Sequence, residues 1–84
     1  MISLDNGSPE ATISLSMEGV GARIGALRER RRWSQEELAR RAKIHRVTLA
    51  DIERGAAQPT LATLSQLARA LRVPLARLLP KGGV

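Results

Sequence analysis

The side chains of this 84-residue chain that could carry chemistry are mostly arginines. Twelve of the 14 basic residues are Arg, there is no Cys, and His45 is the single His. The composition therefore excludes thiolate and multi-His metal sites, and it offers no nucleophile–base pair around His45. A guanidinium presents a planar fork of donors that matches phosphate or guanine, so the arginines favour polyanionic ligands. A coding bias toward Arg is the alternative explanation.

The charge is divided unevenly along the chain. All 14 basic residues lie from Arg23 onward with five of the acids, which gives residues 19–84 a formal charge of +9. Residues 1–18 hold three acids and no base, or −3, and the whole chain carries +6. This division predicts a basic domain behind an acidic arm. A basic domain attracts nucleic acid, acidic lipid or an acidic protein.

Several classes of protein are excluded by what the sequence lacks. One aromatic residue, Trp33, argues against a stacking platform for single-stranded nucleic acid. No apolar run approaches the ~20 residues of a membrane span, and the N-terminus lacks the pattern of a signal peptide. The segment Gly19–Gly25 is not a dinucleotide motif, because Ile24 stands where Gly is required and no strand precedes it. We expect a soluble, cytoplasmic protein that is not an enzyme and binds no cofactor, metal or membrane.

The spacing of apolar residues predicts helices after Gly19. Val20, Ile24 and Leu27 share one face of a first helix. A second helix is expected to begin at Gln35, because Ser34 and Glu37 form a capping box and Trp33 with Leu38 a hydrophobic staple. The buried residues of the second and third helices are expected to be Leu38, Ala39, Ala42, Leu49 and Ile52. Gly55 is expected to end the third helix.

Two further helices complete the prediction. Thr60 caps a fourth helix, whose apolar stripe is Leu61, Leu64, Leu67, Ala68 and Leu71. Pro74 opens a short fifth helix with Leu75, Leu78 and Leu79, and Pro80 stops it. The fold class is therefore all-α, a compact five-helix domain over residues 19–80. Residues 81–84 form a tail, and residues 1–18 form an arm in which Ile13, Leu15 and Met17 alternate like a short strand.

The segment from Gln35 to Arg54, QEELARRAKIHRVTLADIER, resembles a helix-turn-helix of the phage repressor and Cro type, the XRE-like family. Trp33-Ser34-Gln35 opens it, Ile52-Glu53-Arg54-Gly55 closes it, and Pro59-Thr60-Leu61 begins the next helix. The resemblance covers roughly Gly21 to Leu79 and implies a lambda-repressor-like fold. The residues agree with it, because Ala39 is small where two helices would cross. The helix from about Arg46 to Arg54 is then free to enter a DNA major groove ~12 Å wide.

The resemblance also implies which residues contact DNA. Arg46, Val47 and Asp51 match family positions that reach base edges: guanine for Arg46, the thymine methyl for Val47 and the cytosine amino group for Asp51. Gln35 matches the position where the second helix meets a phosphate. The further phosphate candidates are Arg40, Arg41, Lys43, His45, Thr48 and Arg54. The alternatives are that Arg46 touches only phosphate, that Val47 is simply exposed, and that Asp51 pairs with Arg54.

Three further features follow from the same resemblance. The family often pairs a Glu at the position of Glu53 with an Arg at that of Arg28, which would tie the DNA-reading helix to the scaffold. Lys43 stands where Gly is common, and a positive φ is mildly costly there. The loop Ala56-Ala57-Gln58 lacks the basic residues that many relatives carry.

These expectations combine into two functional hypotheses. The first is a sequence-specific double-stranded DNA-binding transcriptional regulator, a repressor, that reads half-sites ~34 Å apart as a homodimer at the nucleoid. The small size and His45-Arg46 are also similar to controller proteins of restriction–modification systems. The second hypothesis is an antitoxin or other protein-interaction module, which binds a protein partner through residues 1–18.

Overall fold

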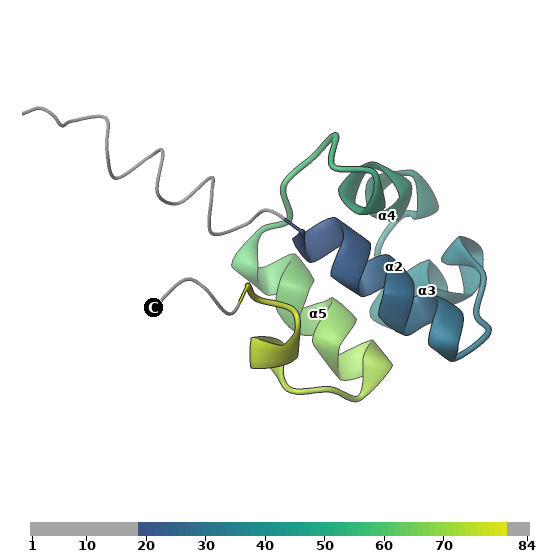
Figure 1. Ribbon diagram of the computed structural model, residues 1–84. Helices are drawn as coiled ribbons and strands as arrows, with labels where there is room; N and C mark the ends of the chain where they lie inside the picture. The colour runs from purple at the N-terminus through teal and green to yellow at the C-terminus, as the bar shows by residue number, and fades with distance from the viewer. Residues whose placement is uncertain (1–18, 81–84) are drawn as a thin grey trace, which may run out of the picture.

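A computed structural model describes residues 19–80, and all the regular structure in this range is helical, with no strand (Figure 1). The elements are α2 (Val20–Arg30), α3 (Gln35–Ala42), α4 (Arg46–Glu53), α5 (Leu61–Leu71) and the 3-10 helix η1 (Leu75–Arg77). The all-α prediction is confirmed for this range. The predicted arm (1–18) and tail (81–84) lie outside the described residues.

Two helices begin at side-chain caps that the sequence predicts. The hydroxyl of Ser34 accepts a hydrogen bond from the backbone N–H of Glu37 at 3.0 Å, before α3. The hydroxyl of Thr60 accepts one from the backbone N–H of Thr63 at 3.1 Å, before α5. Each cap satisfies one of the free N–H groups of a first helical turn. Because these signals are local, both helix starts agree with the sequence analysis.

Three helices are followed, within two residues, by a left-handed residue that is not glycine. The residues are Arg32, Lys43 and Arg72, with φ of 61°, 62° and 60°. At Lys43 the backbone N–H binds the carbonyl of Arg40 at 3.2 Å, and the next N–H, of Ile44, binds that of Ala39 at 3.0 Å. This is the Schellman arrangement, which usually uses glycine. The positive φ expected at Lys43 is therefore confirmed, and the turn keeps regular hydrogen bonds.

The core is formed by twelve apolar residues, none of them more than 4% exposed. They come from the four α-helices and from the residue after η1, and are Val20, Ile24, Leu38, Ala39, Ala42, Leu49, Ile52, Leu64, Leu67, Ala68, Leu71 and Leu78. The predicted stripes are confirmed, with one error: Leu61 is 66% exposed. Leu61 is the first residue of α5, and side chains of a helix tilt toward its N-terminus, so this one points past the end of the core.

The predicted fifth α-helix is wrong, because residues 19–80 hold four α-helices and the single 3-10 turn η1. Its hydrogen bonds span three residues, as from the N–H of Arg77 to the carbonyl of Pro74 at 2.9 Å. Only five residues separate Pro74 from Pro80, which leaves too little chain for an α-helix with regular four-residue bonds. The segment still closes the core, since Leu78 is fully buried.

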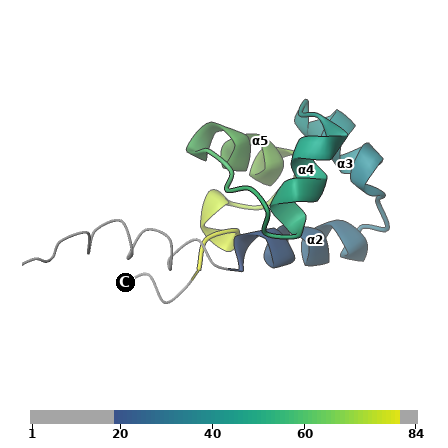
Figure 2. The same cartoon turned by 90° about the horizontal axis from the view of Figure 1, so that it is seen from above.

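Helix α4 packs closely across α2, as Figure 2 shows. A Cβ atom on Gly21 would lie 2.0 Å from the carbonyl oxygen of Ile52, and one on Gly25 would lie 3.3 Å from Oε1 of Glu53. Glycine is required at Gly21, because the clash would be with backbone. This glycine pattern, which does not fit a nucleotide-binding motif, therefore serves the close packing of two helices.

Candidate nucleic-acid interface

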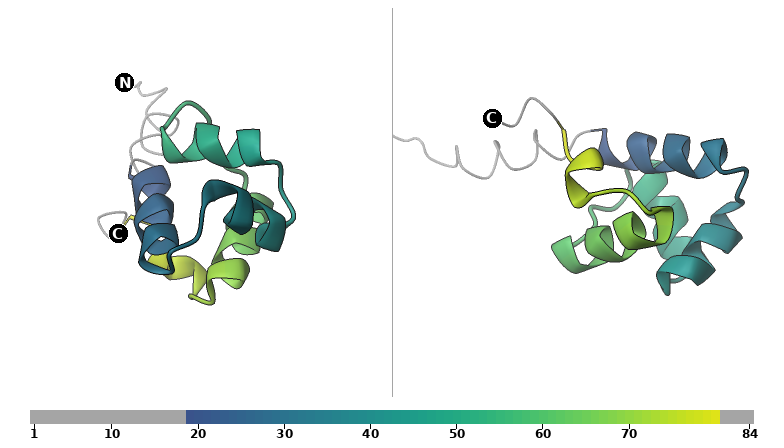
Figure 3. Two further views of the ribbon diagram at one scale, coloured as in Figure 1. Left: turned by 90° about the vertical axis from the view of Figure 1, so that its right-hand side faces the viewer. Right: turned by 90° about the horizontal axis from the view of Figure 1, so that it is seen from below.

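Helix α4 lies at one edge of the molecule (Figure 3). It buries Leu49 and Ile52 against the core, at 0% and 2% exposure. Arg46, Val47 and Thr48 are exposed, and Val47 is 61% exposed although it is apolar. These uncovered side chains leave the first turn of α4 accessible to another molecule. His45 stands at the N-cap of α4, is exposed and makes no side-chain capping bond.

The last turn of α4 carries an ion pair on its surface. A side-chain N–H of Arg54 donates to the carboxylate of Asp51 at 2.7 Å, and the two side chains are 69% and 34% exposed. This confirms the i,i+3 pairing that the sequence analysis gave as the alternative role of Asp51. An exposed pair of this kind contributes about 0–1 kcal/mol. Its low strength leaves both side chains able to exchange partners when a ligand binds.

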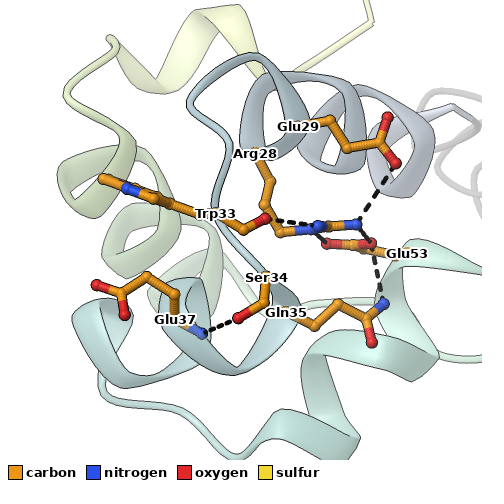
Figure 4. A network of polar contacts seen from close by, with 7 residues as sticks. All are labelled: Arg28, Glu29, Trp33, Ser34, Gln35, Glu37 and Glu53. Carbon is orange, nitrogen blue, oxygen red and sulfur yellow. Dashed lines mark hydrogen bonds and ion pairs between the residues drawn. The ribbon is translucent and has the colours of Figure 1, made fainter.

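A partly buried network fixes the C-terminal end of α4 to α2 (Figure 4). The guanidinium of Arg28 binds the Glu53 carboxylate through two hydrogen bonds, Nε to Oε2 at 2.7 Å and Nη2 to Oε1 at 2.9 Å. Its remaining Nη1 donates to the carbonyl of Trp33 at 2.8 Å. The side chains of Arg28 and Glu53 are only 12% and 10% exposed. The Arg28–Glu53 pair expected from the family resemblance is confirmed.

The electrostatics of this network keep Arg28 charged. The hydrogen bonds that Arg28 donates to the Glu53 carboxylate raise the pKa of Arg28 above its ordinary value, against the opposing effect of burial, and the charges of Glu53 and Glu29 raise it further. The Glu29 carboxylate is more distant, 3.7 Å from Nη2, and its side chain is 74% exposed. Bidentate pairing with little access to water makes the network a strong and directional link between the two helices.

Gln35 joins the same network, which the sequence analysis did not foresee. Its side-chain Nε2 donates to Oε1 of Glu53 at 3.1 Å, so one carboxylate oxygen accepts from both Gln35 and Arg28 (Figure 4). Gln35 is the first residue of α3 and is half-buried. The first turn of α3 is thus held beside the end of α4. The spacing of residues within one helix could not predict this contact, because Gln35 and Glu53 lie 18 residues apart on different helices.

Arg40 and Arg41 lie on another side of α3. Both bind the carboxylate of Glu37, Arg41 through Nε at 2.5 Å, and the guanidinium of Arg41 also stacks 4.3 Å from the centre of the Trp33 ring. The Arg41 hydrogen bond lowers the pKa of Glu37 below its ordinary value. Glu37 therefore binds these arginines, whereas the capping box predicted that it would turn back to Ser34. Only the Ser34 half of that box is observed.

Lys43 is exposed in the turn between α3 and α4. It lines a shallow hollow between α3 and α5 together with Arg41 and Arg69. The structure thus gathers His45, Arg46, Val47, Thr48, Asp51 and Arg54 on α4 and the two residues that cap it, with Gln35 beside the end of that helix. It places Arg40, Arg41 and Lys43 farther along α3 and its turn.

Within residues 19–80, no group of three or more His, Asp or Glu side chains converges in a way that would hold a metal ion. In the same range, no helix has the length and apolar character that crossing a membrane requires.

Most of the helical domain matches a known protein family. A family model described as helix-turn-helix matches residues 24–78. The immunity repressor protein of Bacillus phage phi105 is 46% identical over 54 residues, which cover 64% of this chain and 38% of that protein. The chain therefore spans well under half the length of this curated relative.

Two solved structures of regulatory proteins have folds similar to that of this chain. The restriction-modification controller protein C.AhdI from Aeromonas hydrophila superposes with a TM-score of 0.71 at 31% identity, over 74% of this chain and 94% of that one. SinR, a master regulator of biofilm formation solved in complex with DNA, superposes with a TM-score of 0.68 at 30% identity, over 70% and 95% of the two chains.

Proposed function

This chain belongs to the helix-turn-helix family, and from that premise we propose that it is a sequence-specific double-stranded DNA-binding transcriptional regulator acting as a repressor. The relatives described above are a phage repressor, a restriction-modification controller and a regulator solved with DNA. In this role the protein binds chromosomal DNA in the cytoplasm.

The exposed outer face of α4 is the observation that carries the proposal. An α-helix with its side chains is about 10–12 Å wide, and the major groove of B-DNA is about 12 Å wide. Helix α4 is held at its far end by the Arg28–Glu53 pair while Arg46 and Val47 remain uncovered. A rigid helix with free side chains at its first turn is suited to insertion by its N-terminal end, as recognition helices do.

We assign the base contacts to three residues of α4. Arg46 donates two hydrogen bonds to guanine, and Val47 contacts a thymine methyl group. Asp51 leaves its pair with Arg54 to accept from a cytosine amino group, which frees Arg54 for a phosphate. This exchange disfavours sequences without a donor at that position, because an unpaired carboxylate facing DNA is repelled by the phosphates.

The remaining candidates supply contacts to the sugar-phosphate backbone. The phosphate set is Gln35, Arg40, Arg41, Lys43, His45, Thr48 and Arg54. Gln35 is suited to contact a phosphate through the amide groups of the first turn of α3, since its side chain already binds Glu53. Arg40 and Arg41 act more remotely, because Glu37 offsets part of their charge.

We further propose that the protein binds as a homodimer to two half-sites about 34 Å apart, because one eight-residue helix reads only a few base pairs. The alternative function, an antitoxin or interaction module that uses residues 1–18, stays a prediction from the sequence.

Selection from a pool of random duplex DNA tests the proposal. The full chain should enrich a short motif, repeated as an inverted pair with centres about 10 base pairs apart. The matched control is the Arg46→Ala chain, which should enrich a motif that has lost its preference at one guanine. Recovery of random sequences by the unaltered chain at low salt would contradict the proposed function.

A further inference from the structure

A groove with an apolar floor and an arginine rim runs between α2 and η1, two elements that lie side by side in Figure 3. The apolar residues that line it are the partly buried Leu27 and Leu79 and the exposed Ala26 and Ala76, and the arginines are Arg23, Arg30 and Arg77. Its volume is about 260 Å³. An adjoining hollow shares Leu27, Arg30 and Arg77 and adds Val73 and Arg31. We call this continuous surface the arginine-rimmed groove.

The arginine-rimmed groove lies away from the proposed DNA interface. Helix α2 contacts α4 through Gly21 and Gly25. At 100° per residue, Arg23, Ala26 and Arg30 fall on the opposite side of α2. A chain with α4 bound to DNA would leave this groove uncovered, so the DNA-binding proposal does not explain it.

The rim is strongly cationic and is not neutralised by nearby acids of the described domain. Arg23 and Arg31 donate to backbone carbonyls, of Leu78 and Leu71, and these bonds leave their charges in place. No ion pair within residues 19–80 involves Arg30 or Arg77. An apolar floor beneath several unpaired guanidinium groups fits a peptide that alternates apolar and acidic residues.

We propose that the occupant of the arginine-rimmed groove is the chain's own N-terminal segment, residues 1–18. This segment carries Asp5, Glu10 and Glu18 with no Lys or Arg, and it offers Ile13, Leu15 and Met17 at alternating positions. Its charge of −3 complements the rim, and its apolar residues complement the floor. The inference is independent of the proposed function, since it requires no DNA.

The stretch of chain between Leu15 and Gly19 is long enough for this docking. An extended chain advances about 3.3 Å per residue and a helix about 1.5 Å per residue. Four extended residues, the separation of Leu15 from Gly19, can span about 13 Å, and the eight helical residues from Gly19 to Leu27 span about 12 Å, so the chain is long enough for Leu15 to reach the level of Leu27. A short covalent link also holds the segment at a local concentration on the order of mM, so weak contacts suffice to fill the groove.

A spin label on residues 1–18 of the full chain tests the docking. The chain has no Cys, so Ser16→Cys provides a single attachment point for a nitroxide. Docking predicts a loss of amide peak intensity at Ala26, Arg30 and Leu79 that is restored when the nitroxide is reduced, while the amides of Arg46 and Val47, at the end of α4 away from Gly21, keep their intensity. Uniform loss over the domain, loss centred on α4, or no loss would overturn the proposal.

Two controls identify what fills the groove. Arg77→Glu should restore most of the lost intensity, whereas Arg69→Glu, the same change on an exposed arginine of α5, should leave the loss unchanged. Equal effects of both substitutions would overturn the proposal, and the fluorescence of Trp33 checks that each variant is folded.

A mixture of spin-labelled chains and ¹⁵N-labelled chains without nitroxide shows whether the N-terminal segment of one chain occupies the groove of a second chain. Intensity loss in that mixture equal to the loss within one chain would also overturn it.

Discussion

Neutralising Glu53 should destabilise the domain far more than neutralising an acid on its surface. Glu53→Gln keeps the size of the side chain but leaves the Arg28 guanidinium, 12% exposed, without its opposite charge. The amide also replaces one acceptor oxygen with a donor, so at least one of the hydrogen bonds from Arg28 and Gln35 is lost. Removal of one partner of a buried ion pair costs about 3–5 kcal/mol.

The structure places the expected loss at the lower end of that range, because both side chains retain slight access to water. A loss of about 3 kcal/mol corresponds to a fall in Tm of roughly 12–24 °C for a domain of this size. Trp33 is the single Trp of the chain and packs against the core, so its fluorescence reports thermal and urea unfolding directly.

The matched control is Asp51→Asn, which breaks the exposed pair with Arg54 and should cost less than about 1 kcal/mol. A second control replaces both buried partners, as Arg28→Met with Glu53→Leu, and should recover much of the stability because no charge is then left unpaired. If Glu53→Gln lowered Tm no further than Asp51→Asn does, the Glu53 carboxylate would not stabilise the domain through Arg28.

Three further predictions concern stability. Gly21→Ala should destabilise by roughly 1–3 kcal/mol or more, because its Cβ would lie 2.0 Å from the carbonyl oxygen of Ile52; an unchanged urea midpoint would contradict the close packing of α2 on α4. Lys43→Gly should stabilise by about 0.5–1 kcal/mol, since it relieves a left-handed conformation; a lower urea midpoint would count against that explanation. The lowered pKa of Glu37 implies a stabilising contribution that is present above its unfolded-state value and lost as pH falls through the folded-state value. Glu37→Gln should therefore reduce the stability lost on acidification below about pH 4.5, and equal acid sensitivity of both chains would contradict this assignment.

The parts of the fold that were predictable from sequence are those set by local signals. Ser34 and Thr60 define helix starts through hydrogen bonds to residues three positions away. The apolar stripes place Leu38 and Leu64 in the core, because burial of a helix face follows its periodicity. Errors arose where a segment was short or terminal, as at the 3-10 turn η1 and at the exposed Leu61.

Contacts between distant residues could be predicted only where the family resemblance supplied them. The Arg28–Glu53 pair was expected on that basis, whereas the bond from Gln35 to Glu53 was not. The role of Gly21 depends on the path of α4 across α2, which periodicity within one helix does not encode. For the candidate interface, the resemblance and the spacing of Leu49 and Ile52 predicted which face of α4 is exposed, and the structure added how that helix is held.

Binding affinities for specific and nonspecific DNA show whether α4 reads base edges. The affinity of the full chain is measured for its selected duplex and for a scrambled duplex of equal length, with Arg46→Ala and with the charge-matched Arg69→Ala. Arg46→Ala should weaken binding to the selected duplex by about 1–3 kcal/mol more than binding to the scrambled one, and Arg69→Ala should change both equally. Equal losses on both duplexes for Arg46→Ala would contradict base reading by this residue.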